Sequence, residues 1–102
     1  MYKQTNIAVV IPCYNESNQI LKVLSALPDF IDHIIIIDDA STDQTIEQIK
    51  SIHDSRIIII QHKKNMGVGA AIATGYKWAR VHDVDIAVVM AGDGQMDPDD
   101  LP

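Results

Sequence analysis

The 102-residue sequence has one cysteine, few basic residues and no long apolar run, and each shortage excludes a class of protein. Cys13 rules out an internal disulfide and is compatible with a reducing compartment. The 8 lysines and arginines face 14 aspartates and glutamates, and the net charge of −6 argues against a nucleic-acid backbone or an anionic membrane surface as partner. No apolar run approaches the roughly 20 residues of a membrane span, and the N-terminus lacks a signal-peptide pattern. We therefore expect a cytoplasmic chain without a transmembrane segment.

Short apolar runs rich in β-branched residues recur along the chain. Apolar residues make up 47% of the sequence, which indicates one globular domain with a modest core. The runs show no polar alternation, a pattern typical of strands that are covered on both faces in a parallel sheet. The predicted strands are 7–11, 34–37, 57–60 and 86–90.

Amphipathic segments separate these strands and predict helices. Because strands and helices alternate, and crossovers between parallel strands are right-handed, we expect an α/β fold. In detail, we predict a Rossmann-like three-layer α/β/α arrangement with a mostly parallel sheet, spanning residues 1–102 as one unit. The helical segments are 20–27, then 46–52 with Ser41 or Thr42 as N-cap, and a third that opens near Asn65 and includes Trp78.

Polar clusters follow each predicted strand, at the edge of a parallel sheet where ligands bind. Asp38 and Asp39 stand at the tip of the second strand, where two carboxylates would repel and desolvate each other. A base or ribose ligand would explain at least one of them. Other clusters have two readings: Asn15 could only cap a helix, and Gly67 with Gly69 could be a tight turn as readily as a pyrophosphate contact.

Two other functions each require a feature that this sequence lacks. A dinucleotide-binding fingerprint would place glycine or alanine at position 72, which is Ile72, and would follow the first strand. A response-regulator switch needs a phosphoacceptor aspartate after the third strand, and residues 61–63 supply none.

The segment after the fourth strand carries four carboxylates within eight residues. Oxygen ligands of this kind suit a hydrated divalent cation, although a solvated acidic turn is the alternative. The carboxylates are Asp93, Asp97, Asp99 and Asp100.

Four segments, in this order and spacing, resemble the family 2 glycosyltransferases, and most closely the polyprenyl-phosphate sugar synthases of the dolichyl-phosphate mannose synthase type. The resemblance extends over essentially the whole chain and implies the nucleotide-binding half of a GT-A fold. It implies that a sugar is transferred from a UDP- or GDP-sugar to a lipid phosphate or a growing glycan. The segments are 10–16, 37–45, 65–71 and 93–98.

By motif position, the resemblance also implies a donor site. Pro12, Tyr14 and Glu16 would line the pocket for base and ribose. Asp39 would accept a hydrogen bond from the base, and Ile37 would pack near it.

The acidic segment would complete this site as the family's Asp-x-Asp motif. Gly92 and Asp93 would contact the donor, and Asp93 would bind Mg²⁺ or Mn²⁺ with help from Gln95. The first aspartate of the motif is replaced by Ala91, so we expect altered donor contacts. Asp97 is more simply a helix cap.

Several expectations concern the remainder of the protein and the scattered residues. The general base and the acceptor-binding part are expected after Pro102, at the cytoplasmic face of a membrane in a longer protein. A non-catalytic or degenerate nucleotide-binding module is the alternative that Ala91 suggests. The histidines show no ligand spacing and are predicted to lie on the surface, and Trp78 is predicted to pack against the sheet.

Overall fold

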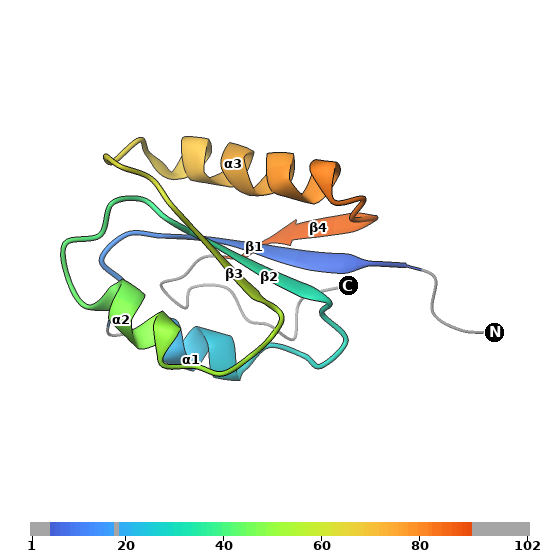
Figure 1. The fold of residues 1–102 in the computed structure, drawn as a ribbon, viewed down its shortest axis with the longest axis horizontal. Helices are drawn as coiled ribbons and strands as arrows, with labels where there is room; N and C mark the ends of the chain where they lie inside the picture. The colour runs from blue at the N-terminus through green and yellow to red at the C-terminus, as the bar shows by residue number, and fades with distance from the viewer. Residues whose placement is uncertain (1–4, 18, 91–102) are drawn as a thin grey trace.

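A computed structural model describes residues 5–17 and 19–90 and shows strands alternating with helices (Figure 1). The predicted apolar runs all form strands, and the predicted order is confirmed. The elements are β1 (Ile7–Cys13), α1 (Ile20–Ser25), β2 (His33–Asp38), α2 (Thr45–Lys50), β3 (Ile57–Gln61), α3 (Val68–Val81) and β4 (Ile86–Val89).

The strands form one parallel sheet in the order β3-β2-β1-β4. The chain winds from β1 outward to β3 and then crosses back to place β4 on the other side of β1. This reversal creates a switch point in strand order beside β1, where open α/β sheets bind ligands. The expected α/β class with a parallel sheet is confirmed.

Helices cover both faces of the sheet, as Figure 1 shows: α3 lies on one face, and α1 and α2 lie on the other. Because side chains alternate along a strand, each strand contributes to two cores. Val9 and Ile11 of β1 pack with the face that carries α1 and α2, whereas Ala8 and Val10 pack with α3. Trp78 packs against this second core, as predicted.

The helix starts differ from the predictions. Helix α2 begins at Thr45, so Ser41 and Thr42 are not its N-cap. The Ser41 hydroxyl instead donates to Asp38, and the Asn15 side chain from the loop after β1 holds the amide of Thr42. Helix α3 begins at Val68 rather than near Asn65, since Gly67 before it has a φ of +96°, which is a left-handed conformation that ends the preceding loop.

Candidate functional site

The loops that follow β1, β2 and β3 meet at the carboxyl edge of the sheet. The strand register aligns Cys13 with Asp38 and Asp38 with Gln61, so the three strands end side by side. The peptide N–H of Asp39 donates to the carbonyl of Cys13 at 2.9 Å, and that of His62 donates to the carbonyl of Asp38 at 2.9 Å. The sheet pattern therefore continues one residue into each loop and fixes where these loops begin.

Asn15 joins the loop after β1 to the loop after β2. Its φ of +53° lies in the left-handed region, which asparagine tolerates better than most residues. The Oδ1 atom accepts hydrogen bonds from the amides of Thr42 at 2.8 Å and Asp43 at 3.3 Å. Its own amide donates to the hydroxyl of Ser41 at 2.9 Å. Asn15 thus caps the turn before α2 and not the helix of its own loop.

Asp43 and Thr45 also join the loop after β1 to the segment that leads into α2. Oδ1 of Asp43 accepts from the amide of Thr45 at 2.9 Å and from its hydroxyl, and Oδ2 accepts from the amide of Ser17 at 3.2 Å. The amide of Glu16 donates to the Thr45 hydroxyl at 2.9 Å. Burial raises the pKa of Asp43, but these hydrogen bonds outweigh it and lower the pKa from 3.8 to about 2.

Asp39 is buried, with 4% of its surface exposed, and it holds the loop that leads into α3. Oδ1 accepts from the amide of Met66 at 2.9 Å, and Oδ2 accepts from the amide of Gly67 at 2.8 Å. The Nδ1 atom of His62 lies 2.8 Å from Oδ1. Burial raises the pKa of Asp39, but the hydrogen bonds from Met66, His62 and Gly67 together lower it by more. The net pKa therefore lies below its ordinary value. Asp39 is therefore ionised and accepts hydrogen bonds only.

His62 lies between the Asp39 carboxylate and helix α3, and its predicted surface position is wrong. Its side chain is only 11% exposed, and Nε2 lies 2.9 Å from the hydroxyl of Thr74. The sequence contains a signal for this contact, which a search for metal-ligand spacing among the histidines does not detect. His62 follows β3 by one residue as Asp39 follows β2, and adjacent parallel strands bring such residues together.

The two consecutive aspartates do not need a ligand to relieve their repulsion. Asp38 accepts from the amide and hydroxyl of Ser41, whereas Asp39 accepts from the loop before α3. Successive side chains of a strand point to opposite faces, so the two carboxylates lie on different sides of the sheet. The electrostatic argument made from the sequence is therefore wrong, and a role for Asp39 in nucleotide binding has to stand on other grounds.

The thiol of Cys13 is buried beside these carboxylates. Burial, together with the charges of Asp38, Glu16 and Asp43, raises its pKa to about 12. A thiol with this pKa is protonated at neutral pH and is a poor nucleophile.

Comparison with known proteins supplies the family. Residues 8–102 match the sequence model of the family described as glycosyl transferase family 2. The chain belongs to glycosyl transferase family 2. This confirms the resemblance seen in the four sequence segments.

Curated relatives of this family 2 chain include enzymes named for lipid-phosphate acceptors. A UDP-N-acetylglucosamine–dolichyl-phosphate N-acetylglucosaminyltransferase of Methanococcus voltae is 37% identical over 93% of the chain, and an undecaprenyl-phosphate mannosyltransferase of Micrococcus luteus is 28% identical over 94%. The chain spans 44% and 41% of the length of these relatives.

A solved structure shares the fold. The S. aureus TarS fragment 1–349, crystallised in complex with UDP, matches 92% of the chain with a TM-score of 0.74 and 22% identity, while the match covers 29% of TarS. No helix in the part of the chain that the structure describes is both long and apolar enough to cross a membrane.

The structure brings most of the predicted donor-site residues to the carboxyl edge. Pro12 is half-buried at the end of β1, and Tyr14, 44% exposed, and half-buried Glu16 lie in the loop beyond it. Ile37 has no exposed surface and lies in the core beneath α3, one residue before Asp39.

The predicted metal and diphosphate residues Gly92, Asp93 and Gln95 lie outside the described residues. Within residues 5–17 and 19–90, no three His, Cys, Asp or Glu side chains form a group that could hold a metal ion. The last described residue, Met90, is buried, and its amide donates to the carbonyl of Val10 at 2.9 Å.

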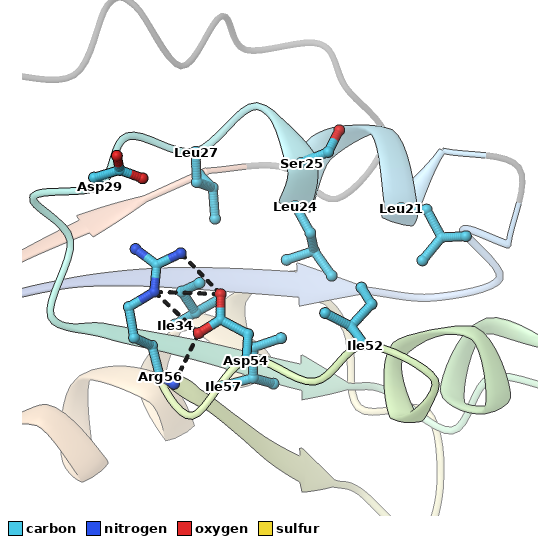
Figure 2. Close-up of a pocket in the computed structure, with 10 residues that line it drawn as sticks. All are labelled: Leu21, Leu24, Ser25, Leu27, Asp29, Ile34, Ile52, Asp54, Arg56 and Ile57. Atoms are coloured by element: carbon cyan, nitrogen blue, oxygen red, sulfur yellow. Dashed lines mark hydrogen bonds and ion pairs between the residues drawn. The ribbon is translucent and has the colours of Figure 1, made fainter.

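A cavity of about 450 Å³ lies at the opposite, amino edge of the sheet, between α1 and the start of β3 (Figure 2). Leu24, Leu27 and Ile52 line it, and Arg56 stands at one end. The Arg56 guanidinium donates to Asp54 at 2.8 Å and to the carbonyl of Ile31 at 3.1 Å. Arg56 therefore fastens loops of the fold together, and the cavity contains none of the predicted site residues.

Proposed function

We propose that this chain binds the nucleoside diphosphate of a sugar donor for a family 2 glycosyltransferase. One observation carries the proposal: an ionised, buried carboxylate, Asp39, stands where the loops after three parallel strands converge. A carboxylate offers about four acceptor positions, and amides and His62 fill three of them. A single N–H group of a base completes the set.

The loop after β1 supplies the remaining surface for the base and the ribose in this proposal. Tyr14 is large, aromatic and 44% exposed, so its ring can stack on a base. Pro12 and Glu16 flank Tyr14 at positions that the family motif assigns to the nucleotide. The bonds from Asn15 and Thr45 hold this loop in place before a ligand arrives, which lowers the entropic cost of binding.

The diphosphate and a divalent cation belong, in this proposal, to the segment that follows β4. In the sequence Gly92 precedes Asp93, and Gln95 follows it by two positions. Asp93 and Gln95 offer hard oxygen ligands of the kind that Mg²⁺ and Mn²⁺ take. The cation would neutralise charge that develops on the departing diphosphate. Strand β4, which precedes this segment in the sequence, lies next to β1 at the switch in strand order.

The acceptor we propose is a polyprenyl phosphate, because two relatives are named for dolichyl- and undecaprenyl-phosphate acceptors. A phosphate oxygen is already anionic, so its attack on the anomeric carbon needs little help from a base. Because such lipids lie in membranes and donor nucleotides are cytoplasmic, we place the reaction at the cytoplasmic face of a membrane. A hydroxyl of a growing glycan, by contrast, would need a general base to remove its proton. We propose no such base among the described residues.

Calorimetric titration of the chain with nucleotides tests the donor site. UDP is the first ligand to use, since it appears in the names of one relative and of the TarS complex, and GDP is the second. We expect binding of one of them that strengthens when Mn²⁺ is added. A folded sample that binds neither nucleotide, with or without Mn²⁺, would refute the proposal.

Two substitutions in the acidic segment test the metal assignment. Asp93→Ala should abolish the increase in nucleotide affinity that Mn²⁺ produces. Asp97→Ala is the matched control, since it removes a carboxylate four residues away and should leave the Mn²⁺ effect intact. If Asp97→Ala abolished the Mn²⁺ effect and Asp93→Ala did not, the assignment of the metal to Asp93 would be wrong.

A further inference from the structure

We propose that His62 is a positioning residue for the donor nucleotide, which it serves by orienting Asp39. The inference rests on the proposed function, because it takes Asp39 as the carboxylate that the base contacts. It adds a residue that the sequence had not included in the site.

The contact between the two residues follows from the sheet. Asp38 pairs with Gln61 in the register of β2 and β3, so Asp39 and His62 are the first residues beyond the two strand ends. The amide of His62 donates to the carbonyl of Asp38, which fixes the backbone of both residues. The imidazole then lies with Nδ1 at 2.8 Å from the Asp39 carboxylate. The strand register and this backbone bond are therefore enough to bring His62 and Asp39 together.

The hydrogen-bond partners determine which ring nitrogen of His62 carries a proton. Asp39 is ionised and cannot donate, so Nδ1 carries the proton and donates to Oδ1. Neutral His62 then has Nε2 as an acceptor for the hydroxyl of Thr74 at 2.9 Å. The same hydroxyl also lies 3.0 Å from the carbonyl of Ala70, to which it can donate instead. The Thr74 hydroxyl therefore links the His62 ring to helix α3.

The consequence concerns the orientation of Asp39. The amides of Met66 and Gly67 each hold one carboxylate oxygen, and His62 adds a second donor to Oδ1. Oδ1 is thereby supplied with two donors, whereas Oδ2 has one and keeps an acceptor position for a ligand. Without His62 this difference disappears, because a base could bond to either oxygen. The geometry thus directs the base toward Oδ2.

Two substitutions of His62 separate positioning from packing. His62→Leu removes both ring nitrogens, while His62→Asn keeps a short amide donor near the place of Nδ1. We expect His62→Leu to weaken nucleotide binding roughly tenfold or more, because Asp39 loses the donor that directs Oδ2 to the base and the base hydrogen bond to this charged group is no longer aligned. His62→Asn should restore most of the affinity. Circular dichroism and thermal unfolding confirm that each variant is folded.

Comparison with a ligand that lacks a nucleobase separates a positioning role of His62 from a purely structural one. Calorimetry with UDP, or with GDP where UDP does not bind, is compared with inorganic pyrophosphate, each in the presence of Mn²⁺. His62→Leu should weaken the nucleotide and leave pyrophosphate within about twofold, because the change is confined to the base contact. Equal weakening of both ligands, or nucleotide binding that is unchanged in folded His62→Leu, would overturn the proposal.

Nitrogen-15 NMR of the histidine rings tests the contact independently of any nucleotide. We expect His62 in the wild-type chain to be protonated at Nδ1, and we expect Asp39→Asn to change its ring shifts. A neutral His62 protonated only at Nε2 would overturn the inference even where UDP binds. Failure of the wild-type chain to bind either nucleotide, with His62 protonated at Nδ1, would instead refute the proposed function and the role in binding that rests on it.

Discussion

Replacing Gly75 by alanine tests how closely helix α3 approaches the sheet. Gly75 is buried in the middle of α3, over strand β1. A Cβ atom added there would lie 2.4 Å from Cγ1 of Val10 and 3.1 Å from its Cγ2. Val10 has no exposed surface, and its β-branched side chain has little rotamer freedom. The helix would have to move away from the sheet to accept the methyl group.

Two opposing effects set the expected change in unfolding free energy. Alanine in place of glycine inside a helix stabilises it by roughly 1 kcal/mol. Overpacking of a buried contact costs about 1–3 kcal/mol, and a contact as close as this one places it toward the upper end. We therefore expect Gly75→Ala to destabilise the chain by about 1–2 kcal/mol. Urea unfolding followed by circular dichroism measures this difference.

Gly69 provides the matched control in the same helix. A Cβ atom added at Gly69 would have no neighbour within 4 Å, so only the helix preference remains. Gly69→Ala should stabilise the chain by about 0.4–1 kcal/mol. Adding Val10→Ala to Gly75→Ala should recover part of the loss, because it removes the atoms that the new methyl group meets. If Gly75→Ala stabilised the chain as Gly69→Ala does, the close approach would be refuted.

Three further predictions concern loops at the two edges of the sheet. Asn15→Gly keeps the left-handed backbone but loses the hydrogen bonds from the amides of Thr42 and Asp43. Urea unfolding should show a free energy of unfolding lower by about 1–2 kcal/mol. An unchanged free energy would mean that these bonds do not join the loops. The folded pKa of Asp43 is lowered to about 2, so its stabilising contribution is present above pH 3.8 and lost as the pH falls toward 2. Asp43→Asn should flatten the acid-unfolding curve between these values. Arg56→Lys, which cannot form the paired bonds to Asp54 and the bond to Ile31 together, should lower the melting temperature, whereas a change at exposed Lys50 should not.

The sequence alone supplied the fold and the edge of the sheet that carries the site. Continuous β-branched runs determine strands that are covered on both faces, and the helices between them require parallel neighbours. The polar segments follow those strands, so their common edge could be predicted without knowing which strands were adjacent. The four motifs supplied the family in the same way, since a motif is a local property of the chain.

The positions of side chains relative to one another were decided only by the tertiary structure. Whether Asp38 and Asp39 repel each other depends on the pleat and on the hydrogen-bond donors near each carboxylate. Nearby Ser41 supplies the donors for Asp38, and the distant loop before α3 supplies those for Asp39. The low exposure of the His62 side chain depends on the register of β2 against β3, which no spacing within the sequence encodes. The need for glycine at Gly75 depends on how near α3 lies to Val10. Local patterns therefore determined the elements and the family, while contacts between residues far apart in the chain determined which groups are free to meet a ligand.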